Sequence, residues 1–458
     1  MAQMRNLFFI ASFLIVQRIW ANISLPAIFS DHMVLQQNAN VKFWGWAAPD
    51  EEVVIRPSWT SEIYKVKANV QAQWEMMVQT PKAGEGYSIT ISGYNYIEIK
   101  DVLIGEVWLC SGQSNMEMSA AWGIKNKDEV AKANVPNIRF FKVTKTTSVY
   151  LQNNLPGKWE VCTPETMKNN SAVAYFFAQQ LQSKIPDTPV GLVVSAWGGT
   201  PIEAWTPEET ILENPVLRDA AQKLTPVPYG PVEPARIFNA MIQPLVGYQL
   251  AGALWYQGEA NVGADIYDAS LEAMIQSWRK LWNDEFPFYY VQIAPYNYGE
   301  DIYSAVKIRN AQRKVLDRVS NTGMVVIDDV STVDDIHPKD KKSVGVRLAN
   351  LALSKHYNVI DEVAEGPLFE SVDFHGKRAI VTFKNNNGLY LSSSESLFEI
   401  AGEDKVFYKA NVKLVNGSVE LKSKEVKTPK YVRFGWNNSY QSNLFNGAHL
   451  PASCFTTE

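Results

Sequence analysis

Hydrophobic and polar residues follow three different patterns along the 458-residue chain. Between residues 22 and 100, short apolar runs such as Val41–Trp46 and Tyr87–Ser92 alternate with turn residues such as Pro49-Asp50. No helical periodicity interrupts them. Short strands at this spacing are typical of a β-sandwich, and we predict a β-sandwich domain over residues 22–100.

Between residues 101 and 360, apolar strand-like runs alternate with helical stretches. The strand-like runs include Val107–Cys110, Val190–Ser195 and Ala251–Tyr256. The helical periodicity predicts helices over Ala172–Ser183, Tyr267–Trp282, Ala305–Val319 and Lys342–Tyr357. Near-continuous apolar strands separated by helices indicate a parallel sheet covered on both faces, and hence an α/β domain. Residues 361–458 return to strands and turns and are expected to form a C-terminal β region.

The first 21 residues are expected to be a signal peptide. Arg5 precedes the apolar run Leu7–Val16, and the small residue Ala21 closes the segment. An apolar run of about ten residues suits the core of a signal peptide and is too short to span a bilayer as a helix. An uncleaved anchor, which Arg18 directly after the run would allow, is the alternative. We predict cleavage near Ala21, a secreted or periplasmic protein, and no membrane span after cleavage.

Composition limits the classes of partner and cofactor that we expect for this protein. The hydrophobic fraction is 46%, the charged fraction is 20% and the net charge is −5 without long runs of one sign, so we expect no nucleic-acid partner. The 14 Trp and 20 Tyr residues suit either sugar binding or large cores. Cys110, Cys162 and Cys454 are too far apart for C-x-x-C metal spacing and are odd in number, so we expect neither a disulfide framework nor a metal site.

Two sequence blocks that follow strand-like runs offer a nucleophile and backbone donors. In Gly112-Gln-Ser-Asn115, a glycine two residues before Ser114 suits a sharp turn that exposes the serine hydroxyl. Helix capping is the structural alternative. In Trp197-Gly-Gly-Thr-Pro-Ile-Glu-Ala-Trp205, paired glycines let backbone amides approach a ligand, as an oxyanion site requires, although a plain turn would look the same.

Two further blocks offer amide donors and a base. Trp255-Tyr-Gln-Gly-Glu-Ala-Asn261 supplies amides and a carboxylate, which could equally be structural. In Val333-Asp-Asp-Ile-His-Pro338, Pro338 holds His337 in a non-helical loop, where a preceding aspartate could orient the imidazole. Together the four blocks provide the nucleophile, oxyanion donors and base of an acyl-transfer site.

These blocks resemble those of the sialate O-acetylesterase family, a branch of the SGNH hydrolases that includes bacterial acetylxylan esterases. The resemblance extends over nearly the whole mature chain, from Leu25–Gln36 to Leu450–Ser453. It implies an SGNH-type, flavodoxin-like parallel sheet flanked by helices, with accessory β regions at both ends.

The resemblance also implies roles for individual residues. Ser114 would be the nucleophile and His337 the base, with Asp334 as the orienting acid and Asp335 as its alternative. The oxyanion hole would comprise the Ser114 amide, Gly199 and Asn261, with Gln257 as the alternative donor to Asn261. We rank Asp334 first because a tight turn brings the residue three positions back against the imidazole ring.

The implied reaction is removal of O-acetyl groups from a carbohydrate, such as 9-O-acetylated sialic acid, through an acyl-enzyme that needs no metal and no organic cofactor. Acetylxylan is the alternative substrate. A function of another class is non-catalytic sugar binding on an esterase scaffold. The presence of both Ser114 and His337 favours catalysis over binding alone.

Overall fold

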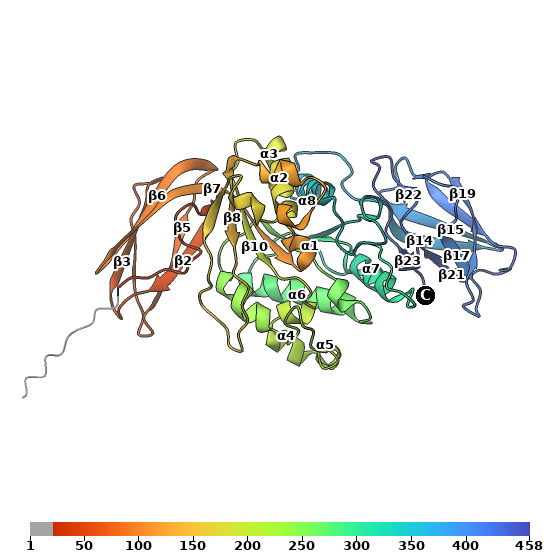
Figure 1. Ribbon diagram of the computed structural model, residues 1–458, viewed down its shortest axis with the longest axis horizontal. Helices are drawn as coiled ribbons and strands as arrows, with labels where there is room; N and C mark the ends of the chain where they lie inside the picture. Colours follow the sequence, from red (N-terminus) through yellow and green to blue (C-terminus); the bar gives the residue numbers. More distant parts are fainter. Residues whose placement is uncertain (1–21) are drawn as a thin grey trace, which may run out of the picture.

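The computed structural model describes residues 22–458, and a mixed sheet lies at its centre (Figure 1). The strand order is β13-β12-β11-β7-β10-β8-β9, and all neighbours are parallel except the antiparallel pair β8 and β9. The strands are β7 (Tyr96–Gly112), β8 (Val135–Lys142), β9 (Trp159–Cys162), β10 (Val190–Ala196), β11 (Gly252–Tyr256), β12 (Phe288–Val291) and β13 (Thr322–Val325). The expected signal peptide lies outside the described residues.

The central strands are buried on both faces, as their near-continuous apolar sequences predict. Successive side chains of a strand point to opposite faces. Val107 and Leu109 of β7 accordingly join one hydrophobic cluster, whereas Trp108 and Cys110 join another on the opposite face. The predicted α/β fold is confirmed.

Two pairs of helices cover these faces. On one side α3 (Ala172–Lys184) packs against α8 (Lys341–Lys355), and on the other side α6 (Tyr267–Trp282) packs against α7 (Ser304–Val315). A Cβ atom on Gly345 would lie 2.6 Å from the Val173 carbonyl oxygen, so glycine lets α8 approach α3 closely. Ser171 caps α3 by accepting a hydrogen bond from the Ala174 N–H at 3.2 Å. All four expected helices are confirmed, with α7 ending four residues before the expected Val319.

Several short helices were not expected from the sequence. They are α1 (Ser114–Glu117), α2 (Lys127–Ala131), α4 (Glu208–Glu213) and α5 (Pro215–Ala221). Helices of four to seven residues give too short a period to recognise, and α4 and α5 are separated only by Asn214. No helix among the described residues is long and apolar enough to cross a membrane.

The N-terminal β region is continuous with the central sheet. Its strands are β1 (Val34–Gln36), β2 (Asn40–Trp46), β3 (Glu52–Pro57), β4 (Tyr64–Lys67), β5 (Gln73–Gln79) and β6 (Gly84–Ser92). The first half of β7 pairs with β6, and its second half pairs with β10 and β11. The boundary expected near residue 100 therefore falls inside a single strand.

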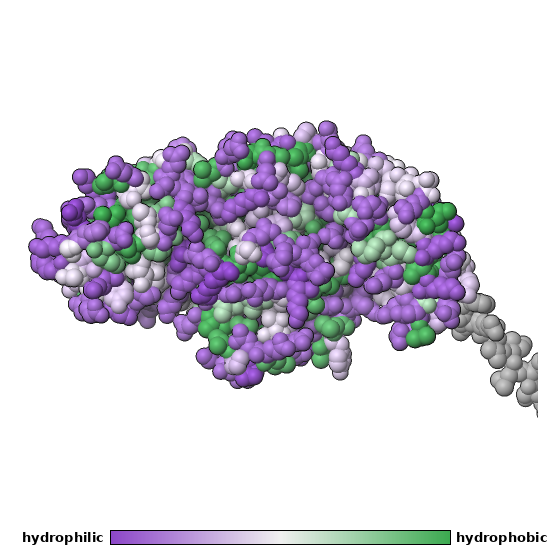
Figure 2. Space-filling view, turned by 180° about the vertical axis from the view of Figure 1, so that it is seen from behind, coloured by the Kyte–Doolittle hydropathy of each residue, from purple (hydrophilic) through white to green (hydrophobic). Residues whose placement is uncertain are grey.

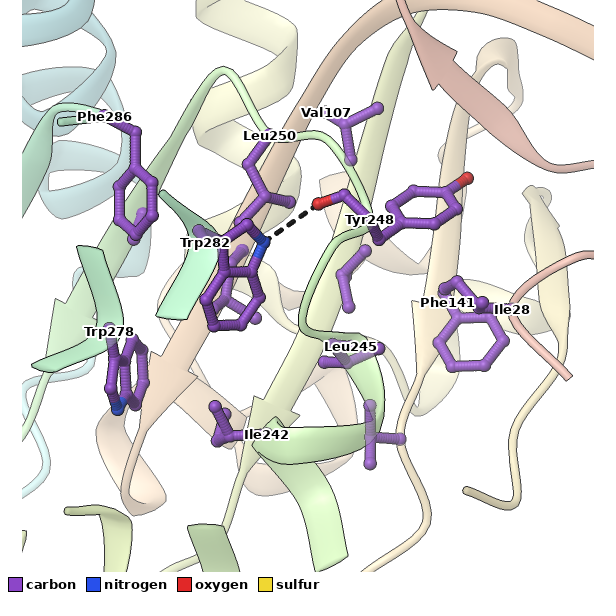
Figure 3. Close-up of a cluster of buried hydrophobic side chains, with 14 of the residues drawn as sticks. Ile28, Val107, Phe141, Ile242, Leu245, Tyr248, Leu250, Trp278, Trp282 and Phe286 are labelled. Carbon is purple, nitrogen blue, oxygen red and sulfur yellow. Dashed lines mark hydrogen bonds between the residues drawn. The ribbon is translucent and has the colours of Figure 1, made fainter. Parts of the chain in front are cut away.

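A shared hydrophobic cluster joins the N-terminal β region to the central domain (Figure 3). Tyr248 lies at the centre of this contact, where its hydroxyl donates to the Val34 carbonyl at 2.6 Å. Its own carbonyl accepts a hydrogen bond from the Trp282 indole N–H at 2.9 Å. The β-sandwich and α6 are thus packed against one another rather than linked by a flexible connection.

The C-terminal region consists of β strands, as predicted, and lies at the opposite end of the molecule from the N-terminal region (Figure 1). One four-stranded sheet has the order β14-β15-β20-β19, another has the order β18-β17-β21-β23, and β16 pairs with β22. The strands are β14 (Leu368–His375), β15 (Arg378–Lys384), β16 (Tyr390–Leu391), β17 (Phe398–Ala401), β18 (Tyr408–Lys409), β19 (Asn411–Val415), β20 (Ser418–Lys422), β21 (Tyr431–Phe434), β22 (Leu444–Phe445) and β23 (Phe455–Thr456). Polar side chains cover most of the surface seen in Figure 2, with small apolar groups between them.

A buried ion pair stands where the C-terminal region meets the central domain. Arg309 of α7 and Asp328 are 2.6 Å apart, and both side chains are 1% exposed. Asp328 also accepts a hydrogen bond from the Ser442 N–H at 3.1 Å, while Arg309 donates to the Tyr440 carbonyl at 3.3 Å. These bonds tie the segment that leads to His337 to the C-terminal region.

Replacing Arg309 with methionine should destabilise the protein strongly, because it leaves the Asp328 carboxylate buried without a counter-charge. We expect a loss of about 3–5 kcal/mol in the free energy of unfolding measured with urea. Lys384→Met is the matched control, since the Lys384–Asp317 pair joins the same two regions but its side chains are 50% and 49% exposed. The control should cost less than about 1 kcal/mol. Equal losses for the two variants would contradict this interpretation.

Candidate active site

Ser114 lies in a sharp turn at the carboxyl end of β7. The turn depends on Gly112, whose φ is +133° and on which a Cβ atom would lie 2.3 Å from the Tyr256 carbonyl oxygen of β11. The Gln113 N–H donates to that same carbonyl at 3.0 Å. Ser114 then opens α1, and it is buried rather than exposed as the sequence predicted. It is 7% exposed.

The structure brings Ser114 and His337 together. The Ser114 Oγ atom and the His337 Nε2 atom are 2.9 Å apart, a hydrogen-bonding distance. His337 lies in the loop between η7 (Asp328–Val330) and α8, and its ring meets the Trp122 ring edge-on at 6.3 Å. Burial and the nearby Lys341 ammonium lower the pKa of His337 below its usual 6.5. At neutral pH the imidazole is therefore uncharged and able to accept a proton.

The two candidate aspartates do not contact the His337 ring. The Asp335 carboxylate accepts a hydrogen bond from the His337 backbone N–H at 2.9 Å and forms an ion pair with Lys339 at 3.2 Å. Asp334 is exposed, and within residues 22–458 its carboxylate has no hydrogen-bond partner. Neither carboxylate bonds to His337 Nδ1. Asp335 thus holds the loop, not the imidazole, and the turn invoked to favour Asp334 does not bring its carboxylate to the ring.

The second of the four sequence blocks, residues 197–205, lies beside Ser114. A Cβ atom on Gly198 would be 3.1 Å from the Ser114 Cβ, and the Gly198 N–H donates to a Glu117 carboxylate oxygen at 3.1 Å. Gly199 follows with a φ of +72°. Across the described chain neither the Gly199 N–H nor the Ser114 N–H has a hydrogen-bond partner. Both are therefore free to donate to a ligand, whereas the Gly198 N–H is not.

The third block, residues 255–261, contains two side-chain amides, Gln257 and Asn261. They differ in whether an N–H group remains free to donate to a ligand. Asn261 Oδ1 accepts from the Ile202 N–H and from Gln257, and its Nδ2 donates to Glu203 at 2.9 Å, which leaves one amide hydrogen free. Gln257 is fully buried, and its Nε2 donates both to the Thr200 carbonyl at 3.1 Å and to Asn261 at 2.7 Å. No donor remains on Gln257, so Asn261 is the better candidate for contact with a ligand.

Sequence reasoning did not identify Asn115 and Lys341 as parts of this site. Lys341 is completely buried at the start of α8, and its Nζ donates to Asn115 Oδ1 at 2.6 Å. The Asn115 Nδ2 donates to Glu259 Oε1 at 2.7 Å. Burial raises the pKa of Glu259 to about 6 and lowers the pKa of Lys341 to about 7. The only available signal was the position of Asn115 directly after Ser114.

Cavities flank the second block on both sides. One of about 490 Å³ is lined by Gly199 and Asn261 and by the exposed ring of Tyr229, which covers Gly199. Another of about 650 Å³ lies beyond Glu117 and contains Lys145, which pairs with that carboxylate. The smaller cavity is lined by two of the residues expected in the oxyanion site, Gly199 and Asn261, whereas Ser114 and His337 line neither cavity.

The parts found together match the requirements of acyl transfer. A serine hydroxyl bonded to a neutral imidazole can attack a carbonyl carbon as its proton passes to the imidazole. Free backbone N–H groups beside the serine can stabilise the negative oxygen that forms during the attack.

Comparisons with known proteins agree with this chemistry. A family model described as carbohydrate esterase, sialic acid-specific acetylesterase, matches residues 104–354. The chain is 28% identical over 416 residues to human sialate O-acetylesterase, covering 81% of this chain and 78% of the human protein. The corresponding orangutan (Pongo abelii) protein is also 28% identical, over 417 residues, with the same shares of each chain covered.

A solved structure is similar over nearly the full length. The crystal structure of a carbohydrate acetylesterase from Xanthomonas citri superposes with a TM-score of 0.86 and 33% identity. The alignment covers 95% of this chain and 99% of the Xanthomonas chain. The likeness therefore includes the flanking β regions as well as the central domain.

Proposed function

The chain belongs to the sialic acid-specific acetylesterase family of carbohydrate esterases, and on that premise we propose that it hydrolyses O-acetyl esters through a covalent intermediate on Ser114. The distance of 2.9 Å between Ser114 Oγ and His337 Nε2 is the observation that carries this proposal. Ser114 and His337 are 223 positions apart in the sequence, and the fold brings this nucleophile and this base into hydrogen-bonding contact.

The proposed reaction has two steps. Ser114 Oγ attacks the acetyl carbonyl carbon while its proton passes to His337 Nε2. The tetrahedral intermediate then collapses, and the sugar oxygen leaves with the proton from His337, so Ser114 carries the acetyl group. In the second step His337 takes a proton from water as the water oxygen attacks the acyl-enzyme. The second tetrahedral intermediate collapses, Ser114 Oγ leaves and regains its proton from His337, and acetic acid is released and ionises to acetate.

The proposed oxyanion site consists of the Ser114 N–H, the Gly199 N–H and the free hydrogen of Asn261 Nδ2. The first two have no partner in the described chain. Asn261 is held by Glu203 and Gln257, so its remaining N–H has a fixed direction. Donors fixed before the reaction stabilise the transition state without reorganisation.

We propose a serine–histidine dyad rather than a triad. The Asp335 carboxylate, which bonds the His337 backbone, orients the loop that carries the base. A hydrogen bond to the backbone fixes the position of His337 but does not stabilise the imidazolium through Nδ1. The imidazolium therefore depends less on a carboxylate than in a triad.

For the substrate we propose an O-acetylated sugar, with 9-O-acetylated sialic acid first and acetylated xylan as the alternative. The names of the mammalian relatives support sialic acid. The Tyr229 ring, 67% exposed beside Gly199, offers a flat surface on which a sugar ring could stack. We further propose that residues 1–21 direct export, so that the enzyme meets glycans outside the cytoplasm.

Ser114→Ala should abolish acetate release from a panel of acetylated sialic acids and acetylated xylan, because it removes the hydroxyl that carries the acetyl group in the proposed intermediate. Ser111→Ala is the control: this serine is buried in β7, three residues before Ser114, and its hydroxyl has no partner among the described residues. Enzymatic assay of free acetate gives the measurement. More than a few per cent of wild-type activity in Ser114→Ala would contradict the proposed nucleophile. A wild-type protein that binds the glycans without releasing acetate would support the sugar-binding alternative.

The sequence ranked Asp334 above Asp335 as the orienting acid. The effects of their substitutions on kcat should follow the opposite order. Asp334→Asn should leave kcat within about twofold of wild type, because its exposed carboxylate makes no contact with His337. Asp335→Ala removes the acceptor of the His337 N–H and should lower kcat on the order of 10-fold, the equivalent of one hydrogen bond to a charged group. Steady-state kinetics with 4-nitrophenyl acetate distinguishes them. A loss approaching about 10⁴-fold in Asp334→Asn, as seen for the aspartate of the serine protease triad, would mean that Asp334 orients the imidazole.

A further inference from the structure

A buried bridge of three side chains lies directly behind the Ser114–His337 pair. Lys341 Nζ donates to Asn115 Oδ1 at 2.6 Å, and Asn115 Nδ2 donates to Glu259 Oε1 at 2.7 Å. Lys341 and Asn115 are completely buried, and Glu259 is 8% exposed. We call this arrangement the Glu259–Asn115–Lys341 bridge.

The bridge joins three of the elements that make up the site. Asn115 follows Ser114 in α1, Glu259 begins η6 (Glu259–Asn261) after β11, and Lys341 begins α8 four residues after His337. Asn115 Nδ2 also donates to the Ile336 carbonyl at 3.1 Å, directly before His337. One amide side chain thus fixes the backbone of the base relative to the backbone of the nucleophile.

The contribution of the bridge to folding stability does not by itself explain its presence. Burying a carboxylate and an ammonium costs several kcal/mol per ion, and apolar residues of similar volume often do as well. Within the described residues Glu259 Oε2 has no hydrogen-bond partner. The Lys341 ammonium lies 5.2 Å from the centre of the Tyr256 ring, shielded from water. Because the ionisable groups of Glu259 and Lys341 are buried beside the Ser114–His337 pair, they are candidates for a functional role.

We propose that Asn115 and Lys341 are positioning residues for the hydrolysis. In this role Asn115 sets the separation of Ser114 from His337, and the buried Lys341 cation keeps the imidazole in its proton-accepting form. The inference rests on the proposed function, because it requires His337 to be the base.

Several charged groups near His337 change its pKa, in different directions and to different extents. Lys341 of α8 and Lys339 of the loop lower the pKa of His337, and Asp335 raises it. Lys339 and Asp335 are partly exposed and pair with one another, so solvent and mutual attraction weaken their net effect.

The remaining charged groups near the loop are compensated. Lys125, from the segment before α2, pairs with Asp340 at 3.1 Å, and Glu259 of η6 reaches the loop only through Asn115. α1 presents the neutral Ser114 hydroxyl, and the Trp122 segment presents an uncharged ring. Lys341 is thus the one cation facing His337 that is fully buried among the described residues. Its pKa of about 7 keeps it charged in the acidic range where His337 gains a proton.

The experiment is the pH dependence of kcat/KM for 4-nitrophenyl acetate, measured on the full-length protein with and without the Lys341 charge. Lys341→Met removes both the charge and the hydrogen bond to Asn115, whereas Lys341→Gln removes the charge and retains a donor group. The lost cation raises the pKa of His337, so we expect the acidic limb of the profile to move to higher pH in both variants. Lys339→Met is the matched control, and its shift should be much smaller because Lys339 is exposed to solvent.

Asn115→Ala tests the positioning role separately. It should lower kcat on the order of 10²-fold with little change in KM, the loss that a displacement of about 1 Å at reacting groups causes. A destabilised variant that unfolds at acidic pH would also move the limb, because the folded fraction itself depends on pH. The melting temperature of each variant is therefore measured at every pH of the profile, and only rates from fully folded protein are compared.

The proposal is wrong if the acidic limbs of both Lys341 variants coincide with that of wild type. It is also wrong if Lys339→Met moves the limb as far as Lys341→Met does, or if Asn115→Ala keeps its kcat. These outcomes differ from failure of the proposed function, in which the wild-type enzyme releases no acetate or Ser114→Ala remains active.

Discussion

The backbones of β7, β10 and β11 meet at Gly112, and the arrangement of the site depends on this contact. Gly112 is paired with Ala196 on one side and with Tyr256 on the other, and a Cβ atom there would overlap the Tyr256 carbonyl. Because the three strands are parallel and end together, the loops bearing Ser114, Gly199 and Asn261 leave the sheet at the same edge. The His337 loop follows the parallel strand β13 and precedes α8, and it brings the His337 ring to Ser114.

The flanking β regions take part in this arrangement through packing and buried polar contacts. β7 continues from the N-terminal sheet into the central one, so the strand that ends at Ser114 is anchored at both of its ends. On the other side the Arg309–Asp328 pair connects the segment before His337 with the C-terminal region. The structural match to the Xanthomonas acetylesterase extends over these regions as well, with 95% of this chain aligned.

The sequence predicted features that depend on local pattern and missed those that depend on distant contacts. The range predicted for α3 ends one residue before the observed helix does, and α6 was predicted at both ends. The four blocks and their family resemblance singled out Ser114 and His337, whose side chains the structure brings to 2.9 Å from one another. The choice between Asp334 and Asp335 stays a prediction, because the local sequence does not show that the Asp335 carboxylate is held by Lys339 and by the His337 backbone. Lys341 looked like an ordinary helix start, since nothing local reveals that its ammonium lies buried against Asn115.

The central claim is that an acetyl ester forms on Ser114 and that His337 serves both steps. Rapid mixing with 4-nitrophenyl acetate, an acid quench and peptide mass spectrometry test it most directly. The account predicts an acetyl group on the peptide containing Ser114, present in wild type and absent from Ser114→Ala and His337→Ala. Acetate release with no acetylated Ser114 at any mixing time, together with acetylation of another residue, would contradict it.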